Sequence, residues 1–332
     1  MTPLGPSETR IGPLTVGLQG LGCLGMSEFY GPVDEQEAVA TIRRALDLGA
    51  NLLDTADVYG HGGNERLVGR AVAGRRDEAV IATKFGVLRP GPGVGAGIRA
   101  DPDYVRESCD ASLRRLGVDH IDLFLLTRAD PAVPVEETAG ALAELIRAGK
   151  VRAYGLSEVG PATLRRAHAE APVAALESEW SLWSRDLERE TLAVCRELGI
   201  AVIPYAPLGR GFLTGGIRSA DQLDAQDFRR FGLPRFEPDN LAHNLPLADR
   251  LARLAAGFGV TAAQLALAWL HHQGPDVVPI PGTKRRERLE ENTAAVQLRL
   301  GPDDLAAVAA AVPAAAVRGA RWNEASSAYL DG

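Results

Sequence analysis

The chain has 332 residues, of which 46% are hydrophobic and 24% are charged, and its formal net charge is −7. This apolar content can fill a core, so disorder of the whole chain is excluded, and the length fits two average domains or one large α/β barrel. The acidic balance argues against a nucleic-acid partner, which usually meets a basic surface. No run approaches about 18 consecutive apolar residues, so we expect no membrane span.

Short apolar runs alternate with longer amphipathic stretches along the chain. Runs of about 4–6 residues rich in Val, Ile and Leu predict strands that are buried on both faces. The predicted strands are Val16–Leu21, Asn51–Asp54, Ala79–Thr83, Ile121–Leu126, Ala153–Leu156, Ala174–Glu177, Ala201–Tyr205 and Val277–Ile280. The predicted helices are Asp34–Leu48, Glu65–Val72, Asp103–Leu116, Glu136–Ala148, Ala162–Ala169, Leu187–Leu198 and Ala262–His272.

This even rhythm predicts one domain over residues 1–332, an α/β fold of the (β/α)8 TIM-barrel type. Its core runs from about residue 14 to 312, and a tail covers 313–332. A doubly wound parallel sheet is the alternative, but eight even units without a break in composition favour the barrel.

Two segments interrupt the rhythm, the Gly/Pro-rich Pro90–Gly97 and the long polar Gly209–Leu245. Both follow predicted strands, and the loops after the strands form the catalytic face of a barrel. The tail Ala320–Gly332 carries Trp322 and Tyr329, and it either folds over that face or is loose.

The cysteines and the first residues predict a cytoplasmic protein. Cys23, Cys109 and Cys195 are widely spaced and form no Cys-x-x-Cys pair, which is typical of reduced thiols. The opening MTPLGPSETR has no apolar segment of the kind that a secretory signal needs. The adjacent His271 and His272 have no third ligand at helical spacing, so we expect no metal site.

The segment Gly20–Gly25 matches the pattern G-x-G-x-x-G of dinucleotide-binding proteins. That fingerprint requires a helix to begin at the motif, but here the chain continues into Gly31-Pro32, which breaks a helix. A Gly-rich loop at the mouth of a barrel is therefore the better interpretation.

Asp54 ends the second predicted strand, Tyr59 follows five residues later, and Lys84 ends the third strand. Adjacent strand ends would bring the three side chains together. A lysine ammonium favours tyrosinate and lowers the tyrosine pKa, so Tyr59 could exchange a proton while Asp54 neutralises Lys84. A buried Asp–Lys ion pair beside an uninvolved tyrosine is the alternative, because structural pairs also shift pKa values.

These motifs resemble the aldo-keto reductases, in the family's order, from about Leu14 to Val312. The branch of pyridoxal reductases and auxin-induced-type reductases is the most similar. The matching segments are Gly20–Ser27 (GLGCLGMS), Leu53–Gly60 (LDTADVYG), Ile81–Gly86 (IATKFG), Gly155–Glu158 (GLSE), Glu179–Trp183 (EWSLW), Tyr205–Gly211 (YAPLGRG) and Ile280–Lys284 (IPGTK). The resemblance implies a TIM barrel that binds NADPH/NADP+ and reduces carbonyl groups of small molecules. It leaves open whether the chain forms a homo-oligomer.

The resemblance also implies roles for individual residues. Tyr59 would be the general acid, Lys84 would tune the pKa of Tyr59, and Asp54 would pair with Lys84. Ser157 and Glu158 would lie near the nicotinamide carboxamide. The remaining implied contacts of the nicotinamide and the pyrophosphate are Glu177, Trp180 (stacking on the ring), Tyr205, Leu208, Gly209, Arg210 and Gly211.

A basic segment after the eighth predicted strand opens a helix, a setting in which cations and free N–H groups suit a phosphate. Thr283, Lys284 and Arg288, next to Gly282, are our candidates for the 2′-phosphate of NADP. A solvated basic helix start is the alternative. Glu291 and Asn292 would face the adenine.

The chain departs from the family pattern at the catalytic histidine, where it has Thr127. Threonine donates a hydrogen bond but carries no positive charge. His120 lies before its strand, at the wrong end of the barrel, and His61 in a Gly-rich loop is a weak substitute. A second departure is Glu177, where the family usually has glutamine. Its carboxylate would accept from the carboxamide or, if burial raised its pKa, donate as a neutral acid.

Three readings of the missing histidine stay open. The protein could still reduce carbonyls, with Thr127 orienting the oxygen. The site could have shifted to C=C or C=N reduction, or to redox-neutral chemistry. The protein could instead be an NADP(H)-binding sensor with weak turnover, against which the intact Asp54, Tyr59 and Lys84 argue.

Overall fold

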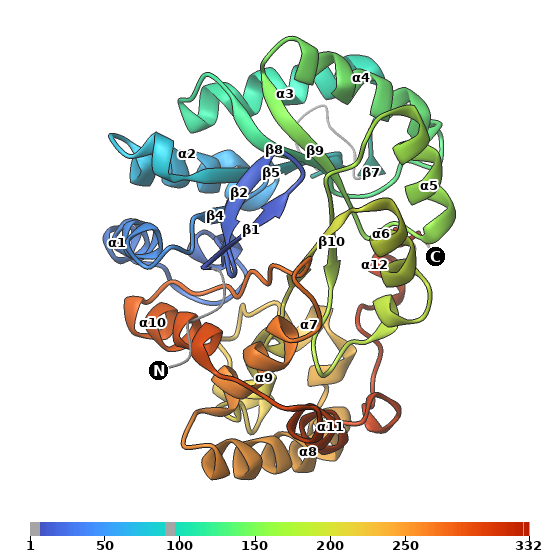
Figure 1. Cartoon of the computed structure of the whole chain (residues 1–332). Helices are drawn as coiled ribbons and strands as arrows, with labels where there is room; N and C mark the ends of the chain where they lie inside the picture. Colours follow the sequence, from blue (N-terminus) through green and yellow to red (C-terminus); the bar gives the residue numbers. More distant parts are fainter. Residues whose placement is uncertain (1–6, 90–96, 328, 332) are drawn as a thin grey trace.

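A parallel sheet of seven strands forms most of a barrel wall, and helices surround it (Figure 1). The structure is a computed structural model and describes residues 7–89, 97–327 and 329–331. In spatial order the strands are β11 (Ala201–Tyr205), β10 (Ala175–Glu179), β9 (Val151–Ser157), β8 (Ile121–Leu126), β5 (Val80–Phe85), β4 (Leu52–Asp54) and β3 (Leu21–Gly22). The predicted TIM-barrel architecture is confirmed.

The segment 276–282 closes the barrel between β11 and β3 through isolated parallel bridges, Val202 to Val277 and Gly22 to Gly282. It is too irregular to form a full strand, because Pro279 and Pro281 have no N–H to donate to a neighbour. Their carbonyls instead accept from the amides of Gly20 and Gly22, at 3.0 and 3.4 Å.

The close approach at this seam explains the glycines of the G-x-G-x-x-G segment. A Cβ on Gly20 would lie 2.6 Å from the Leu52 carbonyl oxygen and 2.9 Å from the Ile280 side chain. Only a three-residue 3₁₀ turn, Leu24–Met26, follows β3. The glycines therefore let strands pack, and the interpretation as a loop at the barrel mouth agrees with the structure.

Helices follow the strands in the alternation that the sequence predicts, with small shifts at their ends. They are α1 (Glu35–Asp47), α2 (Gly63–Val72), α3 (Pro102–Leu116), α4 (Val135–Arg147), α5 (Pro161–Glu170), α6 (Thr191–Leu198), α7 (Arg229–Gly232), α8 (Pro238–Gly257), α9 (Ala262–His271), α10 (Arg286–Ala294), α11 (Pro302–Ala311) and α12 (Glu324–Ser327). Two predictions need correction. The helix expected at Leu187–Leu198 begins only at Thr191, and the end of the Gly209–Leu245 insertion belongs to the 20-residue α8.

An antiparallel hairpin of β1 (Glu8–Ile11) and β2 (Leu14–Gly17) lies across the barrel end that faces the viewer in Figure 1. The strand predicted at Val16–Leu21 is therefore wrong as one element, since β2 ends at Gly17 and β3 begins at Leu21. Ile11, Leu14 and Val16 pack on the apolar side chains inside the barrel. The hairpin closes this end, so the opposite, C-terminal end of the strands is left for a ligand.

Two apolar layers hold the fold. The inner layer has fifteen buried side chains: three belong to the hairpin, and the other twelve, including Leu52, Leu123 and Ile203, lie in the barrel beneath it. A larger layer lies between the strands and the helices and contains Trp180, Trp183 and Trp269. Cys23, Cys109 and Cys195 are buried free thiols, as predicted.

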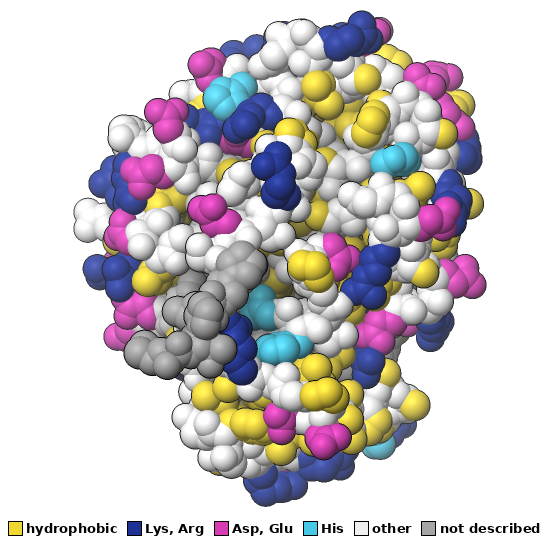
Figure 2. Space-filling model, in the orientation of Figure 1, with side chains coloured by type: hydrophobic (Ala, Val, Ile, Leu, Met, Phe, Trp, Pro, Cys, Tyr) yellow, Lys and Arg dark blue, Asp and Glu magenta, His cyan; other side chains and the backbone are white. Residues whose placement is uncertain are grey.

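Charges of both signs are interspersed over the face seen in Figure 2. Across the described part of the chain, no group of three or more His, Cys, Asp or Glu side chains could hold a metal ion. No single described helix is long and apolar enough to cross a membrane. Only α8 and α9 taken together meet that criterion, and they are bent by 85°. Of the Pro90–Gly97 loop, residues 90–96 lie outside the described residues.

Candidate active site

A cavity of about 680 Å³ opens at the C-terminal ends of the barrel strands. Successive strands supply its polar floor, because parallel strands end at the same edge of the sheet. β4 ends at Asp54, β5 carries Lys84, Thr127 follows β8, Ser157 ends β9, and β10 carries Glu177. The structure thus brings together five predicted site residues.

Lys84 lies at the centre of this floor with its side chain only 2% exposed. Its Nζ forms a short hydrogen-bonded ion pair with Asp54 Oδ1 and lies 3.2 Å from Glu177 Oε1. Burial alone would lower the pKa of Lys84, but the two carboxylates outweigh it and raise that pKa well above 10.5. Lys84 is therefore a permanent cation here.

Tyr59 begins a short 3₁₀ turn (Tyr59–Gly62) directly after β4 and lines the same cavity. Lys84 Nζ lies 5.3 Å from the centre of its ring. The expected lowering of the Tyr59 pKa needs correction. Burial raises the pKa above its usual 10, and the Lys84 ammonium opposes this only in part because Asp54 and Glu177 also raise it. Tyr59 is therefore a protonated donor at neutral pH.

Glu177 shares Lys84 with Asp54, and its side chain is only 4% exposed. Burial, and then the nearby Asp54 charge, raise the pKa of Glu177 to about 8. Burial raises the pKa of Asp54 as well. These shifts favour the protonated acid, one of the two forms that we considered for Glu177, because one proton on the two buried carboxyl groups leaves a net charge near zero beside the Lys84 ammonium.

Thr127 occupies the cavity wall beside these groups, and its amide donates to the Phe85 carbonyl at 2.8 Å. Its Oγ1 is buried and has no hydrogen-bond partner among the described residues. A buried hydroxyl without a hydrogen-bond partner lowers the stability of the fold unless a ligand supplies that partner. His61, the weak substitute considered for the histidine that the resemblance implies, is exposed and does not line the cavity.

The far end of the cavity is formed by the loop after segment 276–282 and the start of α10. Its wall contains Gly282, Thr283, Lys284, Arg285, Arg288, Glu291 and Asn292. Arg288 pairs with Glu291 at 2.8 Å. Lys284 Nζ instead donates to the carbonyls of Tyr30 and Gly31, at 2.9 and 3.2 Å, and so ties the loop after β3 to this end.

Tyr205, Leu208, Arg210 and Gly211, four of the residues that the resemblance assigns to the cofactor, also line the cavity. Gly209 does not line it. Its backbone has φ +56°, and a Cβ there would lie 2.6 Å from the Trp183 ring, so the glycine serves packing.

Trp180 is also outside the cavity, contrary to our expectation of ring stacking. It is fully buried, donates to Glu188 at 2.9 Å and packs edge-on against Trp269. Side chains alternate across a strand, so Glu177 pointing into the barrel sends Trp180, three residues on, to the helix side. Tyr205 is the aromatic residue that the strand ends present to the cavity.

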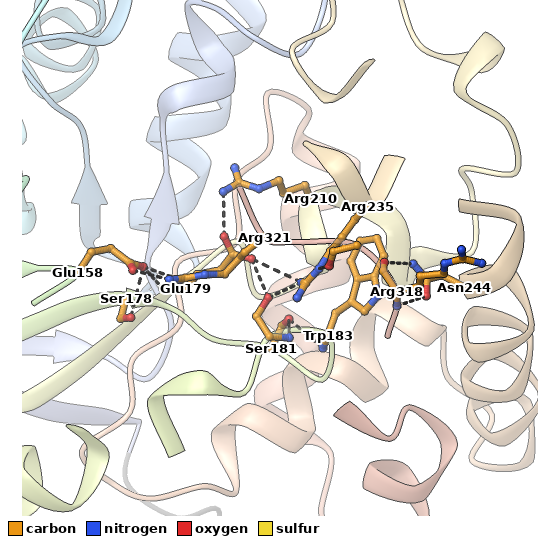
Figure 3. A network of polar contacts seen from close by, with 12 residues as sticks. Glu158, Ser178, Glu179, Ser181, Trp183, Arg210, Arg235, Asn244, Arg318 and Arg321 are labelled. Atoms are coloured by element: carbon orange, nitrogen blue, oxygen red, sulfur yellow. Dashed lines mark hydrogen bonds and ion pairs between the residues drawn. The ribbon is translucent and has the colours of Figure 1, made fainter. Parts of the chain in front are cut away.

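Glu158 is likewise engaged elsewhere, in the polar network of Figure 3. Both of its oxygens bind Arg321 of the tail, at 2.9 and 2.8 Å, and Oε1 also accepts from the Glu179 amide at 2.8 Å. Burial would raise the pKa of Glu158, but Arg321 outweighs it and lowers that pKa. Its role is to hold the tail, which answers the question of whether the tail folds over this face.

Several wall residues were not predicted from the sequence, among them Tyr30, Arg89 and Arg128. Arg89 pairs with Glu28 at 2.5 Å, across two loops that are 61 residues apart. Such contacts leave no periodic signal. Arg128 could have been noticed, because it directly follows Thr127 at a strand end.

The chain belongs to the aldo/keto reductase family, whose model matches residues 19–313. A glycerol dehydrogenase from Gluconobacter oxydans is 30% identical, with a TM-score of 0.84 over 92% of this chain and 94% of that chain. An aldo-keto reductase from Klebsiella pneumoniae, solved in complex with NADPH, is 29% identical, with a TM-score of 0.73 over 96% of this chain and 98% of that chain. The holo form of an aldo-keto reductase from Bacillus halodurans is 27% identical, with a TM-score of 0.75 over 96% and 97%.

Proposed function

We propose that this protein is an NADPH-dependent reductase that transfers a hydride to the carbonyl group of an aldehyde, ketone or keto-sugar-like small molecule. One observation carries the proposal. Tyr59, Lys84 and Asp54 meet in a cavity whose other end is lined by the basic start of α10. Family membership and relatives solved with NADP(H) support the same conclusion.

The cavity residues fit the cofactor. Lys284 and Arg285 form no ion pair with a carboxylate of the described residues, and they stand where free N–H groups begin α10. We assign the 2′-phosphate to Thr283, Lys284 and Arg288, and the adenine to Glu291 and Asn292. Arg210 and Gly211 are assigned to the pyrophosphate, and Ser157, Glu177 and Tyr205 to the nicotinamide. NADPH, when bound, supplies the hydride.

Tyr59 then donates its proton to the carbonyl oxygen as negative charge develops there. Lys84 stabilises the tyrosinate that remains, since its ammonium lies next to the ring and stays charged. Asp54 holds Lys84 in place and neutralises it between turnovers. The raised pKa of Tyr59 keeps the proton available before reaction.

Thr127 takes the place of the histidine by donating from Oγ1 to the same carbonyl oxygen. Thr127 lines this cavity, and its buried hydroxyl has no described protein partner to give up. One such donor contributes about 10²–10³ in rate at an oxyanion site.

The neutral Thr127 also favours a second candidate, the reduction of C=C or C=N bonds. Without an imidazole, polarisation of a simple carbonyl is weaker, and a conjugated acceptor needs it less. The cytoplasmic location stays a prediction. Whether the chain forms a homo-oligomer stays open.

The direct test is NADPH consumption by the full-length protein against aldehydes, ketones, enones and imines, with Tyr59→Phe in parallel. We expect turnover of carbonyls and a loss of about 10²–10⁴ in kcat in Tyr59→Phe, because the general acid is gone. Tyr104→Phe is the matched control, since this tyrosine lies against Arg99 outside the cavity wall.

Turnover of enones or imines with inert simple carbonyls would replace the first candidate by the second. Tight NADPH binding with no turnover of any class, or activity that survives Tyr59→Phe, would contradict both.

A further inference from the structure

The cationic side chains in the cavity wall differ in whether a carboxylate neutralises them. The wall contains Lys84, Arg89, Arg128, Arg210, Arg229, Lys284, Arg285 and Arg288. Five have a carboxylate partner, through the pairs Lys84–Asp54, Arg89–Glu28, Arg210–Glu179, Arg229–Asp227 and Arg288–Glu291. Within the described residues, Arg128, Lys284 and Arg285 have none.

Lys284 and Arg285 belong to the end of the cavity that we assign to the 2′-phosphate, so an anion accounts for them. Arg128 lies at the other end, next to Thr127. It also lines an adjoining cavity of about 280 Å³, whose wall includes Thr127 and Trp322 but no residue of α10. The positive charge of Arg128, which no described carboxylate neutralises, therefore needs a different explanation.

The contacts of Arg128 leave half of its guanidinium free. Nη1 donates to the Thr127 carbonyl at 2.6 Å and lies 3.4 Å from Ser157 Oγ. No hydrogen bond from Nη2 or Nε to another described residue is formed. Glu158 is close enough for Arg128 to lower its pKa, but Arg321 already binds both of its oxygens.

We propose that Arg128 binds a carboxylate on the substrate, so that the enzyme prefers aldehydes or ketones that carry a carboxylate near the reacting carbonyl. This inference rests on the proposed function and names its substrate class. The hydrogen bonds from Nη1 to Thr127 and Ser157 hold one side of the planar guanidinium and so orient the two-pronged fork of N–H groups on its other side. A fork held in this way matches a carboxylate through two parallel hydrogen bonds.

The surroundings fit a short apolar body between the two polar groups of such a substrate. The adjoining cavity is lined by Val87, Leu88 and Ile98 together with Trp322, beside Thr127 and Arg128. Thr127 Oγ1 would take the carbonyl oxygen while Arg128 takes the carboxylate. Two other arginines of the Gly209–Leu245 insertion, Arg229 and Arg235, are engaged with Asp227 and with Ser184.

The kinetic test compares substrate pairs that differ only in the carboxylate, 4-carboxybenzaldehyde with benzaldehyde and succinic semialdehyde with butanal. We expect wild-type kcat/KM to favour the anionic member by about tenfold or more, mainly through KM. Arg128→Met should abolish that preference, measured as the ratio of kcat/KM between the two members of each pair. Arg128→Lys should keep part of it, because charge remains but the fork is lost.

A binding test separates this inference from the proposed reaction. Benzoate, which cannot be reduced, is titrated by calorimetry into the complex of the full-length protein with NADP+. Wild type should bind it and Arg128→Met should bind about tenfold or more weakly. Arg230→Met should bind like wild type, since Arg230 is an arginine outside both cavity walls.

Equal kcat/KM for anionic and neutral substrates, or a preference that survives Arg128→Met, would overturn the inference while leaving the proposed function intact. Benzoate binding that needs Arg128 in a protein that reduces no carbonyl would support the anion site and reject the proposed function. No benzoate binding to wild type would reject the site itself.

Discussion

At the scale of single residues, the buried hydroxyl of Thr127 is the feature of this site that most needs an explanation. Thr127 lines the same cavity as Lys84 and Tyr59, and its buried hydroxyl has no partner in the described chain. A hydroxyl kept in such a place costs stability. Its retention is explained if the hydrogen bond forms only with the substrate.

Thr127→Val tests this point, because valine has nearly the same shape and removes only the hydroxyl. We expect kcat/KM for a carbonyl substrate to fall about 10²–10³-fold, through the loss of one donor to the developing oxyanion. The melting temperature should stay equal or rise, since no protein hydrogen bond is lost. Thr127→Ser keeps the hydroxyl and should retain most activity. A valine variant with full activity would show that the hydroxyl has no role in the reaction.

At the scale of elements, the tail is fixed over the active-site face by two buried contacts. Asn244 of α8 binds the backbone of Arg318 on both sides, at 2.9 Å each, and Glu158 binds Arg321 through both oxygens (Figure 3). Trp322 then reaches the cavity wall, where the Arg210 guanidinium lies 4.5 Å from its ring. A pair of charges therefore positions an aromatic wall of the site.

Arg321→Met should release this segment, because it leaves the Glu158 carboxylate buried without its partner. We expect the stability to fall by about 2–4 kcal/mol and hydrogen exchange to rise in residues 320–324. Glu158→Gln combined with Arg321→Met should recover part of the loss. Arg318→Met is the control, since only the backbone of this exposed residue is held. Unchanged exchange in Arg321→Met would mean that the pair does not hold the tail.

The strands and helices differ in how well the sequence predicts them. Strands β4, β5, β8, β9, β10 and β11 were predicted closely because buried parallel strands are short unbroken apolar runs. The strand predicted at Val277–Ile280 is wrong, since this segment forms only isolated bridges, and the short pair β6 (Val87–Leu88) and β7 (Gly97–Ile98) was not predicted. The hairpin was missed because β2 and β3 are separated by only three residues, 18–20, and read as one run. Helix α8 was missed because its polar first turns continue the insertion and Pro246 lies inside it.

Some residues of the candidate site could be predicted from the sequence and others could not. Residues at strand ends, such as Asp54, Lys84 and Thr127, were placed correctly because topology fixes the edge where strands end. Trp180 and Glu158 were misassigned because their roles depend on which side of a strand they face and on the distant Arg321. Pairing between remote loops, as in Arg89–Glu28, is decided only by the folded structure.

At the scale of the whole molecule, the barrel buries titratable groups at its active end, and stability must depend on their protons. Glu177 has a pKa of about 8 in the fold against an ordinary value of 4.5. Between these values the folded protein holds a proton that the unfolded chain has released. Raising the pH through this window therefore favours unfolding.

Glu177→Gln removes this dependence, because glutamine resembles the protonated acid at every pH. We expect the variant and wild type to differ little near pH 4, below this window. The variant should then become steadily more stable than wild type up to about pH 8, by several kcal/mol in all, measured by urea unfolding at each pH. A difference that shrinks as the pH rises would show that Glu177 is ionised in the fold at neutral pH.

Hydride transfer to a carbonyl carbon in this cavity can be measured directly by tracing a deuterium label from NADPH to the product. The full-length protein is mixed with NADPH deuterated at C4 of the nicotinamide and a carboxylate-bearing aldehyde, and the product is examined by NMR. We predict one deuterium on the carbinol carbon of the alcohol, formed in step with NADPH loss and strongly slowed in Tyr59→Phe. Deuterium on an alkene- or imine-derived carbon only, or NADPH bound without labelled product across all substrates, would contradict the claim.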